Sequence, residues 1–295
     1  MDGLILIDKK EGVTSYDAVM LTKRIFHTRK VGHCGTLDPF ASGLLIIGIN
    51  QATKVMTFLE HDYKEYIATI KFGKSTDTYD ITGKVISESK INNFTKEQVE
   101  SVLLQFIGEI TQIPPIYSSI HIDGKKAYEY ARNNQEVELP SRQVTIHDIK
   151  LLEIDEESIK IYVKCSRGTY IRSLGVDIAK KLNNDGCLLT LRRISIGGIS
   201  VDNANSYEQL ENQQVTLIDI KDALRYKKLY INDVRILKRV YNGQNIILKQ
   251  ETEDDIIIVD NDNAVAIYKR DKEVFFKCVR GLYDENIRLE RLKSL

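Results

Sequence analysis

Residues 32–43 read Gly32-His33-Cys34-Gly35-Thr36-Leu37-Asp38-Pro39-Phe40-Ala41-Ser42-Gly43, and they lead directly into an apolar run at residues 44–49. The stretch holds one carboxylate, Asp38. Glycines at both ends permit a tight or left-handed backbone, and Pro39 fixes φ beside the carboxylate and removes an amide donor. This composition predicts a loop that holds Asp38 in one pose ahead of a buried strand. An Asp-Pro pair is also common at ordinary turns and helix starts, and on local grounds that structural interpretation is favoured.

Length and composition indicate a protein with two domains. The chain has 295 residues, which favours a large domain of roughly 200 residues with a small one attached. A hydrophobic share of 42% and a charged share of 28% are ordinary for a soluble protein, and no apolar stretch approaches the roughly 20 residues that span a bilayer. Asp2 and a short apolar run at residues 4–7 do not resemble a signal peptide. We therefore expect a cytoplasmic protein.

The cysteines and histidines predict no metal site. Four cysteines stand far apart without a Cys-x-x-Cys pair, and five histidines show no His-x-x-x-His spacing. These patterns argue against a structural zinc and against a disulfide framework. We expect reduced thiols and no bound metal.

The formal net charge is zero, which by itself mildly disfavours a nucleic-acid-binding protein. The distribution of charge is less even. One basic cluster leads into the Asp38 stretch and another lies near the expected domain boundary; they consist of Lys23, Arg24, His27, Arg29, Lys30 and His33, and of Arg225, Lys227, Lys228, Arg235, Lys238 and Arg239. Each is either a solvated face or a grip for phosphates.

Hydrophobic periodicity predicts mixed strands and helices in the first 200 residues. We expect strands at residues 4–7, 44–49, 64–73, 144–154, 158–165 and 188–196, and a polar loop or hairpin at 73–83. Helices are expected after an N-cap at Thr14 or Ser15, at 52–59, at 95–107 with a Thr95–Gln98 capping box, at 124–132, and after a cap at Thr169. Residues 206–224 read as an irregular helical linker, and four short β-rich runs between residues 245 and 279 predict a small all-β barrel. The fold class is therefore α+β.

Two local features leave alternatives open. Residues 113–132 interleave Tyr with Lys, a composition suited to stacking on single-stranded bases, although an amphipathic hairpin over the core is the favoured interpretation on this evidence alone. Arg172 falls in the first turn of its predicted helix, where a cation opposes the helix dipole. A partner carboxylate or exposure to solvent would each relieve that conflict.

Ordered motifs across residues 1–200 resemble those of the bacterial TruB family of tRNA pseudouridine synthases. The resemblance is carried by Gly32-His33-x-Gly35-x-Leu37-Asp38-Pro39-x-Ala41-x-Gly43, Asp8-Lys9, Lys64-x-Tyr66, Thr76-Asp77-Thr78-x-Asp80, Ile113-Pro114-Pro115-x-Tyr117-Ser118, Gly124-Lys125-Lys126-x-Tyr128, Gly168-Thr169-Tyr170-Ile171-Arg172 and Leu191-Arg192-Arg193. Lys10 departs from the family pattern, in which Pro is common. The tail matches by position and β-rich character more than by motif.

The resemblance implies an enzyme that isomerises uridine 55 in the T loop of tRNA. Asp38 would be the nucleophile, Tyr66 the aromatic under the target base and a candidate for proton transfer, and Arg172 the cation paired with Asp38. The residues implied to bind RNA are Lys9, His33, Asp80, Tyr117, Lys125, Lys126, Tyr170 and Arg192. Lys9 would act near the active site, and His33 would contact the loop from which the base is extruded.

The resemblance also implies the architecture and the partners. We expect a mixed, largely antiparallel sheet flanked by helices at residues 1–224, with an RNA-clamping insertion at 114–142, and a PUA-like β module at 225–295. The partner is tRNA, no cofactor or metal is implied, and we expect a monomer. Two other functions stay open: a non-catalytic tRNA-binding or tRNA-folding protein, and a glycoside-type hydrolase with Asp77 or Asp80 as a second carboxylate.

Overall fold

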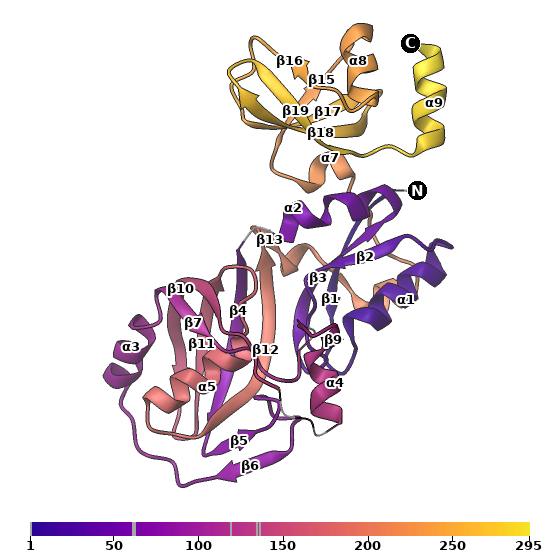
Figure 1. Cartoon of the computed structure of the whole chain (residues 1–295). Helices are drawn as coiled ribbons and strands as arrows, with labels where there is room; N and C mark the ends of the chain where they lie inside the picture. Colours follow the sequence, from indigo (N-terminus) through magenta and orange to yellow (C-terminus); the bar gives the residue numbers. More distant parts are fainter. Residues whose placement is uncertain (1, 61–62, 119, 134, 136) are drawn as a thin grey trace.

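The computed structural model describes residues 2–60, 63–118, 120–133, 135 and 137–295. Figure 1 shows a long twisted sheet with helices on its faces, and above it a smaller sheet that carries the C-terminus. This arrangement confirms the α+β fold class, with a small β module at the end of the chain.

The main sheet has ten strands and follows the order β14-β1-β3-β12-β4-β11-β10-β7, with β2 added to β3 and β13 added to β12. It is mixed, because β1 pairs with β14 and β12 with β3 in parallel while the other pairs are antiparallel. The strands are β1 (Gly3–Lys9), β2 (Val31–Cys34), β3 (Ser42–Ile49), β4 (Lys64–Phe72), β7 (Gly108–Gln112), β10 (Arg142–Ile154), β11 (Ser158–Cys165), β12 (Gly186–Ile196), β13 (Ile199–Ser200) and β14 (Asn205–Ser206).

The apolar runs of β1 and β3 are continuous because both faces of these strands are covered. Leu4 and Leu6 face one core, whereas Ile5 and Ile7 face another that contains α1 (Ser15–Ile25) and α6 (Tyr207–Glu211). Strands buried on both faces read as unbroken hydrophobic segments. By contrast, buried and half-buried residues alternate along β4. Its buried residues pack with α3 (Lys96–Leu104) and α5 (Ile171–Lys181), which cover one face of the sheet there.

The two halves of the sheet meet where β12 runs beside β3. The parallel pairing there joins only Arg192 to Ser42 and Arg193 to Gly43. Gly43 has a φ of +107°, and a Cβ at this position would lie 2.2 Å from the Arg193 carbonyl oxygen, so that no larger residue fits. The Asp38 stretch therefore lies at the junction between the half-sheets.

Two small hairpins extend from the main sheet. β5 (Lys74–Thr76) pairs with β6 (Val85–Glu88), which confirms the hairpin predicted around residues 73–83. The expected insertion at 114–142 contains the pair β8 (His121–Ile122) and β9 (Lys125–Lys126), followed by α4 (Ala127–Arg132). Residues 119, 134 and 136 of that insertion lie outside the described residues.

The C-terminal sheet has the order β15-β17-β18-β19-β16. Its strands are β15 (Lys227–Tyr230), β16 (Ile246–Ile247), β17 (Asp255–Asp260), β18 (Asn263–Lys272) and β19 (Phe275–Gly281), and it carries α8 (Val234–Tyr241) and α9 (Glu285–Ser294). The opposite face joins the first part of the chain through one apolar cluster that includes residues of η1 (Asn50–Val55), α2 (Met56–Glu60) and α7 (Ile220–Ala223). In Figure 1, α2 and α7 lie between the two sheets. The domain boundary at 224/225 stays a prediction.

Several sequence expectations are wrong in detail. Residues 31–34 form β2 rather than a loop, because Gly32 and His33 pair with Gly48 and Ile47 of β3. The N-cap of α5 is Tyr170 rather than Thr169, and α3 ends at Leu104 rather than at residue 107. β7, β15, α8 and α9 were not expected. The irregular helical linker expected at residues 206–224 is confirmed, because it contains the short helices α6 and α7.

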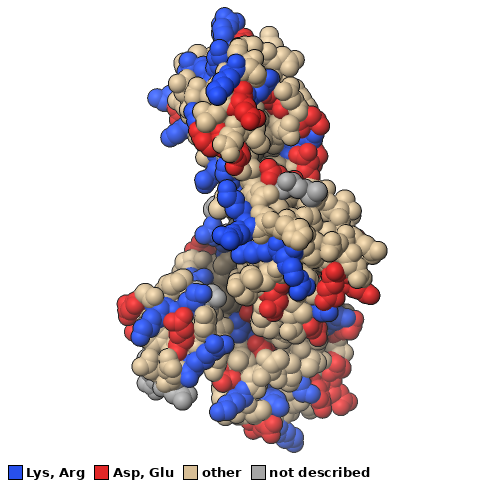
Figure 2. Space-filling model, turned by 90° about the vertical axis from the view of Figure 1, so that its right-hand side faces the viewer, with Lys and Arg blue, Asp and Glu red and all other residues tan. Residues whose placement is uncertain are grey.

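Basic side chains gather where the two parts of the molecule meet. Figure 2 shows Lys and Arg concentrated at the waist beneath the C-terminal module. There Lys54 donates to the Tyr283 carbonyl oxygen at 2.9 Å, and burial together with the charges of Lys30 and Arg280 lowers the pKa of Lys54. In the part of the chain that the structure describes, no helix is both long and apolar enough to cross a membrane.

Candidate active site

Asp38 and Arg172 form an ion pair between the two half-sheets. Arg172 Nε lies 2.8 Å from Asp38 Oδ2, and Nη2 donates to Asp38 Oδ1 at 3.2 Å. The Arg172 side chain is 4% exposed, whereas a third of the Asp38 side chain remains open to solvent. The structure therefore confirms that a carboxylate offsets the cation in the first turn of α5, and it leaves that carboxylate accessible.

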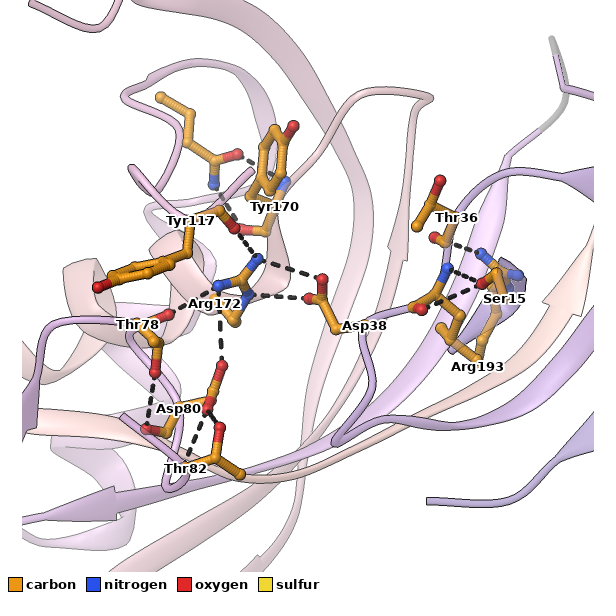
Figure 3. Close-up of polar contacts among 12 residues, drawn as sticks. Ser15, Thr36, Asp38, Thr78, Asp80, Thr82, Tyr117, Tyr170, Arg172 and Arg193 are labelled. Carbon is orange, nitrogen blue, oxygen red and sulfur yellow. Dashed lines mark hydrogen bonds and ion pairs between the residues drawn. The ribbon is translucent and has the colours of Figure 1, made fainter. Parts of the chain in front are cut away.

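Three further groups fix the Arg172 guanidinium. Nη1 donates to the Thr78 carbonyl oxygen at 2.8 Å and lies 3.7 Å from Asp80 Oδ2, and Nη2 donates to the Tyr117 carbonyl oxygen at 2.9 Å. Figure 3 shows these partners converging on Arg172 from several segments of the chain. A planar guanidinium with its donors satisfied on several sides keeps one orientation, and thereby orients Asp38.

Asp80 is itself buried and held in place. Its Oδ1 accepts hydrogen bonds from the Thr82 amide at 3.0 Å and from the Thr82 hydroxyl at 2.5 Å. The Thr76 hydroxyl donates to the Asp80 carbonyl oxygen at 2.7 Å. The side chain of Asp80 is 6% exposed, so that in this structure it presents little surface to RNA and acts on Arg172.

The Asp38 loop is supported from the side opposite Arg172. The Ser15 hydroxyl donates to the Leu37 carbonyl oxygen at 3.1 Å, and the Leu37 amide donates to Ser15 Oγ at 2.9 Å. The Gly12 amide donates to the Pro39 carbonyl oxygen at 2.8 Å. Asp38 is thus bracketed by backbone contacts on both neighbouring residues.

Lys9 belongs to this support. Its side chain is fully buried, and Nζ donates to the carbonyl oxygens of Val13 at 2.7 Å, Lys10 at 3.0 Å and Pro39 at 3.4 Å. Burial lowers the pKa of Lys9 to about 8, although the Asp38 carboxylate acts in the opposite direction. An RNA contact by Lys9 stays a prediction; in this structure the residue has no exposed surface for one.

A cavity of about 460 Å³ opens over Asp38. Its walls come from the Asp38 loop, β4, α5, β12 and the insertion, through residues that include Tyr66, Tyr117, Tyr128, Tyr170, Arg172 and Leu191. The volume is in the range of small-ligand sites, and the lining combines aromatic faces with a few polar groups. Tyr117 and Tyr170, both predicted site residues, line it, whereas His33, Lys125, Lys126 and Arg192 lie outside the lining.

The surroundings shift the pKa values of Asp38 and Tyr66, two acidic groups of the cavity. Burial raises the pKa of the Asp38 carboxyl above its ordinary value, and the charge of Arg172 acts against that rise. Burial also raises the pKa of the Tyr66 phenol to about 12, while Arg193 lowers it. The Arg172 guanidinium thus favours the anionic form of Asp38 against the effect of burial, whereas Tyr66 is protonated at neutral pH.

The remaining predicted RNA-binding residues do not line the cavity. Arg192 forms two hydrogen bonds to the Asp8 carboxylate, at 2.9 and 2.6 Å. Lys125 and Lys126 lie over the rings of Tyr130 and Tyr128 in the insertion. His33 is half-buried on β2, opposite Ile47. Their contacts with RNA stay predictions.

Sequence reasoning assigned no role to two buried residues that build the site, although one of them, Arg193, stands in the Leu191-Arg192-Arg193 motif. Gln112 donates to the Tyr170 carbonyl oxygen at 3.0 Å and accepts from the Tyr170 amide at 2.7 Å, which fixes the start of α5. Arg193 is fully buried beside the Asp38 loop. Alternation along β12 could have found Arg193, because it shares a face with Leu191 and Ser195.

The residues described by the structure include no group of three or more His, Cys, Asp or Glu side chains placed to hold a metal ion. All four cysteines are free thiols. The polar groups of the cavity are one carboxylate, one guanidinium, the amine of Lys64, and several hydroxyl and backbone groups, a set suited to nucleophilic and proton-transfer chemistry.

Comparison with known proteins gives a consistent family. The model of the TruB family pseudouridylate synthase (N terminal domain) matches residues 23–171. The tRNA pseudouridine synthase B of Oceanobacillus iheyensis is 39% identical over 282 residues, which cover 91% of this chain and 93% of that protein. The tRNA pseudouridine synthase B of Mycoplasma mycoides subsp. mycoides is 37% identical over 295 residues, covering 97% and 98%.

Solved structures show the same fold at lower identity. The crystal structure of a Cbf5-Nop10-Gar1 complex contains a chain with a TM-score of 0.71 and 22% identity, covering 97% of this chain and 86% of that one. The likeness supports the arrangement of the main sheet and the C-terminal module.

Proposed function

Because this chain belongs to the TruB family of pseudouridylate synthases, we propose that it converts uridine 55 in the T loop of tRNA to pseudouridine, with Asp38 as the nucleophile. The chain is an isomerase that forms pseudouridine in tRNA. The finer assignments, which are the position in the tRNA and the role of each side chain, rest on the motifs and on the geometry of the cavity.

The ion pair between Asp38 and Arg172 is the observation that carries the proposal. It places an accessible carboxylate at the base of a cavity lined by Tyr66, with its anionic form supported by a buried cation. A binding protein would not require such an arrangement, because phosphates and bases are held by cations and aromatic faces rather than by a carboxylate.

The reaction is balanced without any other reactant. The bond from C1′ to N1 breaks, the freed uracil turns over, and a bond forms from C1′ to C5. The proton lost from C5 is matched by one gained at N1, so that no oxidant, reductant or group donor is consumed. A carboxylate such as Asp38 can attack either C1′ or C6, and both routes stay open.

Tyr66 offers the uracil a surface while it is detached. Its ring lines the cavity and its side chain is 7% exposed, so that it forms part of a rigid wall. The target base must leave the stack of the T loop to reach this wall, at a cost of a few kcal/mol. We propose that stacking on Tyr66 and phosphate contacts elsewhere offset that cost, and that the Tyr66 hydroxyl takes part in proton transfer.

The contacts of the insertion favour its proposed role as a clamp over the RNA, rather than the amphipathic hairpin that the local sequence favoured. Tyr117 and Tyr128, from residues 114–142, line the same cavity as Asp38. Lys126 and Arg132 flank the ring of Tyr128. Aromatic faces with adjacent cations suit an unstacked RNA strand. We propose further that the enzyme works as a cytoplasmic monomer without cofactor or metal.

Replacing Asp38 tests the proposal. T-loop RNA is incubated with the wild-type protein, with Asp38→Asn and with Asp271→Asn, which changes an exposed carboxylate in the C-terminal module. Mass spectrometry then maps pseudouridine. We expect modification at position 55 with the wild type and with Asp271→Asn, and none with Asp38→Asn. Retained turnover in Asp38→Asn would contradict the assignment of the nucleophile.

The same samples separate the other functions. RNA that is bound but chemically unchanged by the wild type would indicate a tRNA-binding or tRNA-folding protein. Release of free uracil would indicate a hydrolase with Asp77 or Asp80 as second carboxylate. The ion pair of Asp80 with Arg172 argues against the latter, because it places Asp80 behind the guanidinium.

A further inference from the structure

Arg193 is one of the largest fully buried side chains of the protein. Its Nε donates to the Leu44 carbonyl oxygen at 2.7 Å, Nη2 to the Gly35 carbonyl oxygen at 3.0 Å, and Nη1 to the Thr36 carbonyl oxygen at 3.4 Å. Gly35 and Thr36 precede Asp38, whereas Leu44 follows it on β3. One guanidinium thus joins the two ends of the Asp38 loop.

Within the described part of the chain, no carboxylate lies at ion-pair distance from Arg193. A buried charge without an opposite charge costs free energy, and hydrogen bonds have to offset that cost. An apolar residue would avoid the cost of burying a charge, but it would leave the carbonyl oxygens of Gly35, Thr36 and Leu44 without these hydrogen bonds. The retention of a cation here therefore points to a task that its hydrogen bonds perform.

Strand register also places Arg193 beside the second reactive group of the cavity. Arg193 pairs with Gly43 on β3 and with Tyr66 on β4, so that it lies where the two half-sheets meet. The two residues are direct cross-strand partners, and the charge of Arg193 lowers the pKa of the Tyr66 phenol. Figure 3 shows Arg193 next to Thr36 and Ser15, with Asp38 between this group and Arg172.

We propose that Arg193 is a positioning residue for pseudouridine formation, which fixes the Asp38 loop and the Tyr66 hydroxyl relative to each other through one buried guanidinium. The inference rests on the proposed roles of Asp38 and Tyr66. Arg193 has no exposed surface with which to touch RNA. Its loss should therefore lower the rate of the bound complex without weakening tRNA binding.

Two substitutions test this role. Arg193→Gln keeps some hydrogen-bonding capacity but loses the charge and the planar guanidinium with its fixed donors. Arg193→Lys keeps the charge and loses the guanidinium. Misplacement of reacting groups by about 1 Å can cost on the order of 100-fold in rate. We expect the single-turnover rate at saturating tRNA to fall at least about tenfold in Arg193→Gln and about three- to tenfold in Arg193→Lys. The dissociation constant for tRNA should stay within about threefold of the wild type.

Arg270→Gln is the matched control. Arg270 also donates to carbonyl oxygens, those of Glu251 and Glu253, but in the C-terminal module and outside the cavity. Its replacement should lower the melting temperature and leave the single-turnover rate within about twofold of the wild type. A purely structural role for Arg193 would give the same pattern in the Arg193 variants.

Combination with Tyr66→Phe adds a second readout. If Arg193 acts partly through the Tyr66 hydroxyl, Arg193→Gln should cost less rate in the Tyr66→Phe background than in the wild type. If the effects of Arg193→Gln and Tyr66→Phe on the rate are fully additive, Arg193 acts only on the Asp38 loop, and its proposed action on the Tyr66 hydroxyl is overturned.

Failure of this inference and failure of the proposed function are distinguishable. Turnover in Asp38→Asn would overturn the proposed function. An inactive Asp38→Asn beside a folded Arg193→Gln with a rate within threefold of the wild type would overturn only the role of Arg193. If Arg193→Gln does not fold, Arg193→Lys decides, and a rate within twofold of the wild type then overturns the role.

Discussion

Asp38 and Arg172 are 134 positions apart in the sequence, yet the guanidinium of Arg172 lies 2.8 Å from the carboxylate. A cation in the first turn of a helix opposes the dipole, so that position alone predicts a nearby anion. It does not predict which anion. Two anions are present, Asp38 and Asp80, and their positions differ. Asp38 is partly exposed and faces the cavity, whereas Asp80 is buried behind Arg172.

Asp80→Asn tests this division. The variant removes a charge that lies 3.7 Å from Arg172 and loosens the segment that supplies the Thr78 carbonyl. Because Arg172 would then orient Asp38 less tightly, we expect the single-turnover rate to fall about tenfold or more. Rate and tRNA affinity are measured separately.

The two roles of Asp80 predict different results. A direct RNA contact, which the family resemblance implies, would weaken tRNA binding and leave the rate at saturation largely intact. A positioning role would lower the rate at constant affinity. Asp148→Asn is the control for loss of a negative charge, because Asp148 is a half-buried carboxylate on β10 that pairs with Lys150, and it should change neither quantity.

Lys9 predicts a dependence of stability on pH. Its pKa is about 8 in the folded protein and 10.5 in an ordinary environment, so that between these values the unfolded chain binds more protons than the folded one. Stability therefore rises with pH across this window. We expect the free energy of unfolding of the wild type, relative to Lys9→Met, to rise by ~3 kcal/mol between pH 8 and 10.5.

Denaturant unfolding across that pH range measures the difference. Lys10→Met is the matched control, because Lys10 is the exposed neighbour and bonds only loosely to Glu211. A difference between wild type and Lys9→Met that stays constant with pH would contradict the burial of a titrating amino group.

At the residue scale, the reactive side chains are easier to predict from the sequence than the side chains that support them. Asp38, Tyr66 and Arg172 stand in motifs, and the structure brings all three to one cavity. Arg192 and Arg193 read alike in the sequence, but alternation turns Arg192 toward Asp8 and buries Arg193 under the loop. The acceptors of Arg193 are backbone carbonyls, which leave no trace in side-chain identity.

At the scale of elements, the start of α5 carries much of the site's geometry. Tyr170 is the N-cap but makes no side-chain cap hydrogen bond. Gln112, at the end of β7, supplies the missing interaction by bonding both the amide and the carbonyl of Tyr170. Arg172 follows two residues later, so that β7 fixes the helix that aims the guanidinium.

Gln112→Ala should therefore affect both stability and rate. The variant loses two buried hydrogen bonds worth about 1 kcal/mol each, and we expect a loss of ~2 kcal/mol in unfolding free energy. The single-turnover rate should fall several-fold because the start of α5, which positions Arg172, is held less rigidly. Thermal unfolding and single-turnover kinetics are the measurements.

Gln143→Ala is the control for this variant. Gln143 lies on neighbouring β10, is exposed, and donates to the Thr111 hydroxyl. It should change neither stability by more than about 0.5 kcal/mol nor the rate. Equal effects of the two variants would show that α5 does not depend on Gln112.

Elements with a strong local signal were predicted and those without one were not. The Thr95–Gln98 capping box occurs as expected, and of the two caps expected for α1, Thr14 or Ser15, the structure has Thr14. β7 and β2 were missed because each is short and is completed by hydrogen bonds from another strand, β7 from β10 and β2 from β3. α9 was missed because it has no buried residue and hence no clear apolar periodicity.

At the scale of the whole molecule, the two parts share an apolar contact. Ile257, Val259 and Ile267 of the C-terminal sheet belong to the same cluster as Leu4 and Leu44 of the main sheet. Deletion of the C-terminal module would expose this cluster and destabilise what remains. Substitutions on the surface are therefore the sharper probe of how the module contributes to RNA binding.

The two basic clusters of the sequence differ in the structure. In the second cluster, Lys227 pairs with Glu251, Lys228 with Asp222 and Arg235 with Asp233. In the first, none of Lys23, Arg24, Arg29 and Lys30 has a carboxylate within ion-pair distance among the described residues. The first cluster also meets Arg280 of the C-terminal module near Lys54. Despite a net charge of zero, the cations Lys30, Lys54 and Arg280 thus lie near one another where the two parts of the chain meet, and Figure 2 shows Lys and Arg gathered at that waist.

The double variant Lys30→Gln/Arg280→Gln tests whether this waist binds the backbone of tRNA. Both side chains are exposed, so that the fold should be unaffected. Each lost phosphate contact lowers the slope of log affinity against log salt by about 1, and we expect a decrease of about 2 with weaker binding at low salt. The rate at saturating tRNA should not change, because neither residue lines the cavity. Lys96→Gln, on α3 at the far end of the main sheet, is the control and should leave the slope intact. An unchanged slope in the double variant would mean that the waist is a solvated face, and that the affinity for tRNA arises at the cavity and the insertion.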